Sequence, residues 1–332
     1  MTDVRFLTSE DVTGLATPAE YVDAVRDAYR QRGEGAPARP RTKLTSDEPA
    51  GMMTGYLAIL PDSGVMGGYM YSAGFGATDA WFVTPLFDSE SGAPKALLDG
   101  ASMNPFKTGA TGAVGVDALA REDASEIGII GAGSQARGQL RAIATIGDFE
   151  TVRVHSRTAE SREAFAEELA EFVEPEIVPV ETSSEAVAPA DVVVTATTAS
   201  EPVVDDEDIT PGTHITAMGR YDPNARELEA ETIARATYVP DLHDRAFQDA
   251  GSFLQALEEG LIDEDHVHAE LGEIVAGAAP GRQSDEEITI FDSGGTGIET
   301  VAAAKLLYDR AVEADLGTFI ELSPASEALT GR

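Results

Sequence analysis

The chain has 332 residues and no cysteine, and its 59 acidic and 23 basic side chains give a formal net charge of −36. This composition excludes disulfide and thiolate chemistry. It also argues against binding to nucleic acid or to anionic membranes, because both depend on clustered lysine and arginine. No apolar run approaches the roughly 18 residues of a membrane helix, and the first residues do not resemble a secretory signal, so we expect a protein of the cytoplasm.

The stretch up to about residue 120 is rich in glycine, proline and aromatic side chains. Thr17, Pro18 and Glu20 predict the start of a helix, because a capping threonine is followed by proline in the first turn and by glutamate three residues after the cap. Runs rich in glycine, tyrosine and valine predict strands over residues 52–60, 65–72 and 81–87. Small residues at helical spacing then predict a closely packed helix over residues 107–121.

From residue 126 onward, short apolar strands alternate with helices. Strands are predicted over residues 126–130, 151–155, 178–180, 191–195 and 213–217, and helices over about 135–146, 161–172 and 184–188. Two further short strands and a last long helix are predicted over residues 238–239, 288–291 and about 299–314. This alternation is typical of a parallel, doubly wound sheet, so the predicted fold class is α/β.

The acidic residues are spread along the chain, and lysine occurs only at positions 43, 95, 107 and 305. Such a surface suits a cell interior at molar salt, where the Debye length falls to about 3 Å and repulsion between carboxylates is screened. We therefore interpret the chain as coming from a halophile. The alternative is an acidic protein from an organism that lives in ordinary salt.

Gly131, Gly133 and Ala136 form a G-x-G-x-x-A pattern between a predicted strand and a predicted helix, the context in which this motif indicates dinucleotide binding. Gly131 permits a tight turn, Gly133 lets a pyrophosphate approach the backbone, and Ala136 lets the helix pack near the strand. The start of the helix, at Ser134 and Gln135, offers free N–H groups and a partial positive charge to the phosphates. The alternative is a glycine turn that binds no nucleotide.

The end of the next strand distinguishes the two nicotinamide cofactors, because NAD sites usually have aspartate or glutamate there. This chain has Ser156, Arg157 and Thr158 instead. The two hydroxyls can hydrogen-bond a 2′-phosphate and the arginine can pair with it, so we expect NADP(H) in preference to NAD(H). The alternative for Arg157 is a solvated surface arginine. Thr197 follows the predicted strand 191–195, where a dinucleotide usually crosses the sheet.

Seven short segments are spaced along nearly the whole chain. They are residues 88–94, 107–110, the Gly131 loop, 218–220, 226–228, 281–282 and 291–295. Their order and spacing resemble the ornithine cyclodeaminase/mu-crystallin family. The resemblance implies a mixed α+β substrate-binding and dimerisation domain, residues 1–120 plus 296–332, with a Rossmann domain, residues 121–295, inserted in it. It also implies a homodimer, and it places Thr108, Met218 and Gly219 beside the cofactor.

The resemblance implies hydride transfer between a nicotinamide and a carbon that bears nitrogen next to a carboxylate. Three positions depart from the family pattern. Met70 stands in place of the lysine that polarises the imine or carbonyl, Lys107 in place of an arginine that grips the carboxylate, and Tyr221 in place of an aspartate that moves protons. These departures favour reduction of a small imino or keto acid, as in ketimine reductases. The alternatives are ornithine cyclodeamination, alanine dehydrogenase-type deamination, and a ligand-binding protein that holds NADPH without turnover.

We expect Lys107 and Arg41 to hold the substrate carboxylate, since Arg41 falls where the family often has a substrate-binding arginine. Asp222 or a tyrosine such as Tyr69 would then move the proton, and a desolvated Lys107 would also be able to do so. Each residue has a structural alternative: a water-exposed lysine, a loop-capping aspartate and a packed tyrosine. No metal site is expected, because the neighbouring histidines 266 and 268 do not share a helix face.

Overall fold

The computed structural model describes residues 2–218 and 221–326, and the first part of the chain builds a mixed seven-stranded sheet. Its strands are β1 (Thr2–Leu7), β2 (Thr42–Asp47), β3 (Ala50–Leu60), β4 (Val65–Gly74), β5 (Trp81–Asp88), β6 (Pro94–Asp99) and β14 (Thr318–Leu322). They follow the order β14-β1-β6-β5-β4-β3-β2, and each neighbouring pair is antiparallel except β1 with β6. Along β3 most of the length alternates buried and exposed side chains, so the sheet has an inner and an outer face.

Helices α2 (Pro18–Gly33), α3 (Asn104–Leu119) and α11 (Gly297–Glu313) pack together, and α11 covers the inner face of β3, β4 and β5. The short helix α1 (Ser9–Val12) follows β1. A capping box begins both α2 and α11, from Thr17 with Glu20 and from Thr296 with Glu299. The helix start predicted at Thr17 is therefore confirmed.

The middle of the chain forms a second, parallel sheet. Its strands are β7 (Glu126–Ile130), β8 (Thr151–His155), β9 (Glu176–Val180), β10 (Val192–Thr195), β11 (His214–Ala217), β12 (Thr237–Pro240) and β13 (Thr289–Asp292). The helices along this part are α4 (Ser134–Ile143), α5 (Ala159–Leu169), α6 (Ser183–Val187), α7 (Ala230–Ala234), α8 (His243–Asp249), α9 (Gly251–Glu258) and α10 (Leu271–Val275). The order β12-β13-β11-β10-β7-β8-β9 reverses between β7 and β10. The predicted doubly wound α/β fold is confirmed.

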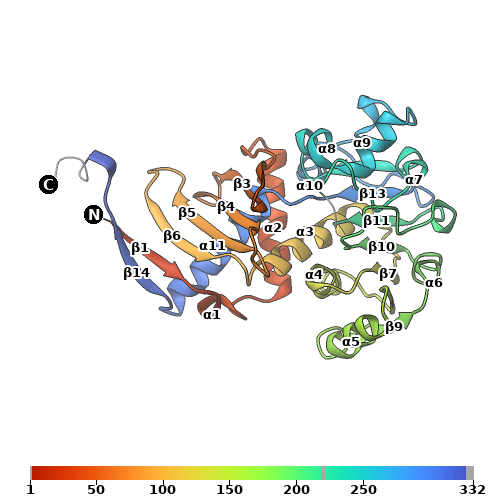
Figure 1. Ribbon diagram of the computed structural model, residues 1–332, viewed down its shortest axis with the longest axis horizontal. Helices are drawn as coiled ribbons and strands as arrows, with labels where there is room; N and C mark the ends of the chain where they lie inside the picture. The colour runs from red at the N-terminus through yellow and green to blue at the C-terminus, as the bar shows by residue number, and fades with distance from the viewer. Residues whose placement is uncertain (1, 219–220, 327–332) are drawn as a thin grey trace.

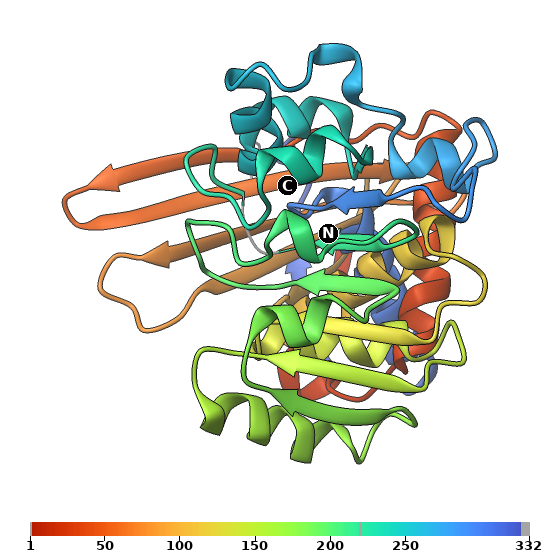
Figure 2. The same ribbon diagram turned by 90° about the vertical axis from the view of Figure 1, so that its right-hand side faces the viewer.

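The two sheets lie toward opposite ends of the long axis, and α3 runs between them (Figure 1). The small residues predicted in this helix allow close contact with α4, since a Cβ at Gly109 would collide with the carbonyl of Gly138. Hairpins of the mixed sheet extend past the parallel strands (Figure 2). The predicted domain boundaries fall in the connections after α3 and after β13. Over the described ranges, no helix is both long and apolar enough to cross a membrane.

Candidate active site

A cavity of about 370 Å³ lies where the inner face of the mixed sheet meets the carboxyl ends of the parallel strands. Aromatic side chains of β3, β4 and β5 form one wall, namely Tyr56, Tyr69, Tyr71 and Phe82. The loops after β7, β10, β11 and β13 form the other, through residues that include Gly133, Thr197, Met218 and Ser293. Ligands of doubly wound sheets bind at this edge of the strands.

A second cavity, of about 510 Å³, adjoins the first over the point where the strand order reverses. The two cavities share Gly133, Ala196, Thr197 and Thr198, so they form one continuous groove. The far end of the second cavity is lined by His155, Ser156, Arg157, Ser161 and Ser183. Among the described residues that line this second cavity there is no carboxylate.

The geometry of the glycine turn fits a dinucleotide. Gly131 has a φ of +115°, and a Cβ there would collide with the carbonyl of Ala196, so the turn requires glycine. In front of Gly133 a Cβ would meet nothing within 4 Å. No side chain caps the start of α4, and within the described structure the buried atoms Gln135 Oε1 and His155 Nδ1 have no hydrogen-bond partner. Open space, uncapped amides and two unpartnered polar atoms suit a phosphate-bearing ligand.

The structure brings most of the predicted cofactor residues to this groove. The nearer cavity is lined by Thr108, Gly133, Ser134, Gln135, Thr197 and Met218, and the farther one by Gly131, Gly133, Ser156, Arg157 and Thr197. Ala136 is buried beneath the turn, and Gly219 lies outside the described residues. Thr158 does not line either cavity. Its hydroxyl accepts a hydrogen bond from the Ser161 N–H and so caps α5.

Arg41 enters the first cavity from the segment that precedes β2. Its Nη2 donates to the carbonyls of Gly294 and Gly295, and its Nε lies 3.3 Å from Asp249 Oδ2. The guanidinium stacks 3.9 Å over the ring of Tyr221. The buried arginine is therefore held from three sides and presents a fixed positive charge to the cavity.

Lys107 enters the same cavity from the first turns of α3. It is only 1% exposed, which contradicts the alternative of a water-exposed lysine. Its Nζ lies 3.4 Å from Glu299 Oε1 and 5.1 Å from the centre of the Tyr69 ring. Burial lowers the pKa of Lys107, and the Glu299 carboxylate opposes that effect. The cavity thus contains two buried cations.

The structure corrects the role expected for Met70. Its side chain is 45% exposed on the outer face of the mixed sheet, because side chains alternate along β4. The neighbours Tyr69 and Tyr71 point inward and line the cavity. Burial raises the pKa of both hydroxyls, and Tyr71 donates a hydrogen bond to the Tyr221 hydroxyl over 3.2 Å. The inward position in this part of β4 is therefore occupied by tyrosine, and Met70 does not face the site.

Asp222 also differs from its expected place. Its carboxylate accepts hydrogen bonds from the N–H and side-chain amide of Asn224, at 3.0 and 3.3 Å, in the turn at Pro223. It does not belong to the residues that line the cavity, whereas the adjacent Tyr221 does. The structure therefore places Asp222 in the loop-capping position that was its structural alternative.

Sequence reasoning missed a buried charge cluster behind the Gly294 loop. Asp241 Oδ2 accepts hydrogen bonds from the Ser293 hydroxyl and from the N–H groups of Gly294 and Gly295. Arg245, fully buried, pairs with the carboxylates of Asp241, Asp249 and Asp292. The cluster fixes the loop that holds Arg41. The spacing of residues 241, 245 and 249, one helical turn apart, was the available signal.

Within the described ranges, no three His, Asp or Glu side chains come together as a metal-binding group. The two histidines considered for such a site each contact a backbone carbonyl instead. His266 Nε2 lies 2.8 Å from the carbonyl oxygen of Ile233, and His268 Nε2 lies 2.9 Å from that of Pro280.

Comparison with known proteins agrees with this geometry. A model of the ornithine cyclodeaminase/mu-crystallin family matches residues 2–315. The Delta(1)-pyrroline-2-carboxylate reductase of Bacillus cereus is 39% identical over 241 residues, 72% of this chain and 74% of that protein. The Thermococcus litoralis Delta(1)-pyrroline-2-carboxylate reductase in complex with NADH and L-proline has a TM-score of 0.91 at 35% identity, covering 96% of this chain and 100% of that one. An archaeal alanine dehydrogenase dimer with bound NAD has a TM-score of 0.90 at 31% identity, covering 97% and 100%.

Proposed function

Because the chain belongs to the ornithine cyclodeaminase/mu-crystallin family, we propose that it is a nicotinamide-dependent oxidoreductase that reduces a small imino acid, or the related keto acid, at the carbon next to the carboxylate. The observation that carries this proposal is the cavity at the carboxyl edge of the parallel sheet, where Arg41 and Lys107 place two buried cations beside the dinucleotide turn. The relatives named as reductases support the assignment.

We assign different roles in the reaction to different residues of the cavity. Nη2 of Arg41 donates to the Gly294 loop, and Nε faces Asp249 at 3.3 Å without a hydrogen bond among the described residues, so we assign the Nη1 edge to the substrate carboxylate. The aromatic wall of β3, β4 and β5 excludes water from the reacting carbon and suits an apolar side chain or ring. A nicotinamide held by the shared residues Gly133 and Thr197 would supply the hydride.

The lining of the cavity also separates the alternatives. Ornithine has a second ammonium group, and none of the described residues that line the cavity is a carboxylate able to pair with it. Burying that ammonium without a partner would be costly, so the site favours an imino acid with an uncharged side chain. The two buried cations each have a carboxylate behind them, Asp249 or Glu299, and both face a cavity whose described lining has no carboxylate, which suits a substrate carboxylate better than a protein that only stores NADPH. Reductive amination of pyruvate stays a second candidate, because an alanine dehydrogenase shares the fold.

For the cofactor we propose NADP(H) in preference to NAD(H). The far cavity has the hydroxyls of Ser156, Ser161 and Ser183 and the guanidinium of Arg157, with no carboxylate among its described lining residues. A 2′-phosphate finds hydrogen-bond donors and a positive charge there. A free 2′-hydroxyl does not find the carboxylate that usually accepts its hydrogen bond.

The purified protein is expected to oxidise NADPH when it is given Delta(1)-pyrroline-2-carboxylate, and to do so with a kcat/KM about 10-fold higher than with NADH. A 10-fold preference corresponds to the lower end of the free energy that a charge-assisted hydrogen bond contributes. We expect the lower end because Arg157 is exposed to solvent. The assay follows nicotinamide absorbance in 0.1 M and 2 M KCl. Activity should be higher in 2 M KCl, where the Debye length falls below about 3 Å and repulsion within the acidic surface is screened.

The control for this assay is a pair of arginine variants. Arg157→Ala should remove the preference for NADPH, whereas Arg153→Ala, whose arginine pairs with Glu126, should keep it. Release of ammonia from ornithine without net cofactor oxidation would identify a cyclodeaminase instead. Equal use of both cofactors by the unaltered protein would overturn the assignment of the 2′-phosphate site.

We also propose that the protein is a homodimer formed by the outer face of the mixed sheet. This face is largely apolar, and its exposed side chains include Leu44, Met53, Leu57, Met70, Trp81 and Val83. Trp81, the one tryptophan of the chain, is 75% exposed, and Leu57 is 65% exposed. A contiguous apolar patch of this kind marks an interaction surface. The alanine dehydrogenase of the same fold is described as a dimer, which favours a second copy as the occupant.

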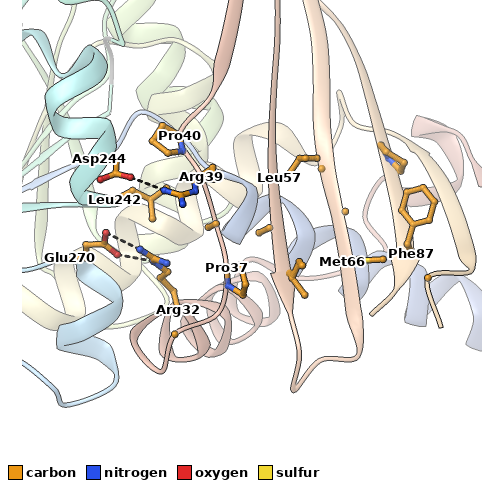
Figure 3. A pocket seen from close by; sticks show the side chains of 18 residues that line it. Arg32, Pro37, Arg39, Pro40, Leu57, Met66, Phe87, Leu242, Asp244 and Glu270 are labelled. Atoms are coloured by element: carbon orange, nitrogen blue, oxygen red, sulfur yellow. Dashed lines mark hydrogen bonds and ion pairs between the residues drawn. The ribbon is translucent and has the colours of Figure 1, made fainter. Parts of the chain in front are cut away.

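A hollow of about 810 Å³ continues this face toward the parallel sheet (Figure 3). Leu57, Met66 and Phe87 line it on the side of the mixed sheet. On the opposite side it is bounded by the ion pairs Arg39–Asp244 and Arg32–Glu270, which join the segments around the two sheets. The hollow gives a second copy a recess to fill, next to a flat apolar surface.

The double variant Leu57→Glu/Trp81→Glu is expected to be monomeric, because two charges on the apolar face would be buried without partners in a dimer. Light scattering should give about twice 34.9 kDa for the unaltered protein and one copy for the variant. Leu261→Glu, which replaces an exposed leucine of the other sheet's domain, should leave the dimer intact. A monomeric unaltered protein would contradict the proposal.

A further inference from the structure

Glu299 lies directly behind the cation that faces the substrate, although it is not part of the cavity wall. It is buried at the third position of α11, where its carboxylate accepts hydrogen bonds from the N–H and hydroxyl of Thr296. Oε1 is also the atom that lies 3.4 Å from Lys107 Nζ. One carboxylate therefore begins a helix and at the same time holds the buried lysine of the candidate site.

We propose that Lys107 is the proton donor to the substrate nitrogen, and that Glu299 is the positioning residue that keeps its ammonium protonated and aimed into the cavity. The inference rests on the proposed reductase function. Its geometric basis is that Lys107 lines the cavity, that Glu299 touches it from behind, and that Asp222 lies outside. The two residues are 192 positions apart and come from α3 and α11, so only the folded chain brings them together.

The proposed step is balanced in protons and electrons. The proton leaves Lys107 Nζ and forms an N–H bond at the imine nitrogen, while the carbon is reduced by the hydride that the bound nicotinamide supplies. Lys107 is left as a neutral amine, which can still donate an N–H to the Glu299 carboxylate, and it then regains a proton from water. Tyr69 and Tyr71 are poor acids in this place, because burial raises the pKa of their hydroxyls.

The protonation of Lys107 depends on groups from four parts of the chain. They are Glu299 on α11, Arg41 before β2, Asp241 after β12 and the ring of Tyr69 on β4. Burial lowers the pKa of the lysine, Arg41 acts in the same direction, and the two carboxylates oppose them. Glu299 is the one in direct contact. Its removal should therefore make Lys107 lose its proton at lower pH.

The small number of lysines allows this to be measured directly. Protein labelled with 13C at lysine Cε should give four signals, from positions 43, 95, 107 and 305, and Lys107→Arg should remove one and so assign it. In the cofactor-free protein we expect Lys107 to titrate at lower pH than the other three lysines. In Glu299→Gln its midpoint should fall further, by about 1 to 3 pH units, the effect of losing an opposite charge within a few ångströms.

The same displacement should occur in catalysis. Since Lys107 must be protonated to act, kcat/KM falls as pH rises through its pKa, and this alkaline limb should move to lower pH in Glu299→Gln by the amount that the titration shows. Glu20 provides a matched control, since it also caps a helix and also pairs with a cation of another helix, Arg310, away from the cavity. Glu20→Gln should leave both the titration and the limb unchanged.

The outcomes separate this inference from the function on which it rests. If no imino acid is turned over, the proposed function fails, and the titration still tests the Lys107–Glu299 pair. If turnover is seen but neither the titration nor the limb moves in Glu299→Gln, the inference is overturned. Glu299→Asp keeps the charge and the helix cap with a shorter reach, so it should show a smaller displacement in the same direction, and it serves if the glutamine variant does not fold.

Discussion

Arg41→Ala is expected to lower kcat/KM for the imino acid by roughly 30- to several-thousand-fold, the equivalent of the about 2–5 kcal/mol that is lost when one partner of a buried charge pair is removed. The guanidinium is the planar cation of the cavity and is held in place from three sides, so the carboxylate loses both its charge partner and its orientation. Steady-state kinetics on the purified variant provide the measurement, and much of the loss should appear in KM.

Two comparisons show whether the loss belongs to the carboxylate. With a carboxamide analogue of the substrate, Arg41→Ala and the unaltered protein should differ little, because the analogue has no charge to pair. Arg39→Ala removes an exposed arginine two residues away, which pairs with Asp244, and it should leave kcat/KM near its starting value. An equal loss with the acid and the carboxamide would mean that Arg41 acts only by holding the loop.

Arg245→Met is expected to lower the free energy of unfolding by about 3–5 kcal/mol, the usual cost of leaving a buried charge without its partner. Arg245 is fully buried, and its loss would leave Asp241, Asp249 and Asp292 close together without that cation. Methionine fills most of the volume, so the loss reports mainly on charge. Urea unfolding, extrapolated linearly to water, is the measurement.

The pH dependence of this loss has a defined sign. Burial already raises the pKa of Asp292 in the folded protein, and Arg245 opposes that effect, so without Arg245 the folded Asp292 should titrate at still higher pH. A folded pKa above the unfolded value, about 3.9, gives stability that is lost as pH rises through the folded pKa. The difference between Arg245→Met and the unaltered protein should therefore be largest near neutral pH and diminish toward about pH 4.

Arg30 offers a matched control for the cluster. It also pairs with three carboxylates, those of Asp27, Glu34 and Asp62, but it does so in water at the surface of α2. Surface ion pairs contribute little to stability, so Arg30→Met should cost much less than Arg245→Met and should show no comparable dependence on pH. Similar losses for the two variants would mean that burial does not determine the contribution of the cluster.

Local pattern was sufficient for the parts of the fold that are built from neighbours in sequence. The strands predicted between residues 52 and 291 are all confirmed, with ends that differ by at most two residues. Four strands were missed: β1 and β14 depend on distant partners, whereas β2 and β6 form hairpins with β3 and β5, their neighbours in sequence. β2 is exposed along almost all of its length, and β14 along all of it, so neither has an apolar alternation to read. β1 pairs with strands that follow about 90 and 315 residues later.

The candidate site likewise contains residues that could be predicted from the sequence and residues that could not. The dinucleotide turn, Arg41 and Lys107 could be found from short motifs and from the family resemblance. Met70 could not be placed correctly, because a shift of one residue along a strand exchanges its two faces, and only the pairing of β4 with β3 and β5 fixes which side chains point inward. The contacts of Glu299 with Lys107 and of Asp292 with Arg245 join segments that no local pattern relates, whereas the spacing of residues 241, 245 and 249 indicates the rest of the Arg245 cluster.

The last residues of the chain complete the sheet that the first residues begin. β14 pairs with β1 at the edge, and α11 covers the inner face of β3 and β4, whereas the parallel sheet is formed entirely from residues 126–292. During synthesis the strands that line the substrate cavity therefore emerge early but wait for residues 297–322 before their apolar side is covered. Long-range closure of this kind is slow and leaves apolar surface in water meanwhile. On the ribosome, the sheet whose first strand is made first is the sheet that is completed last.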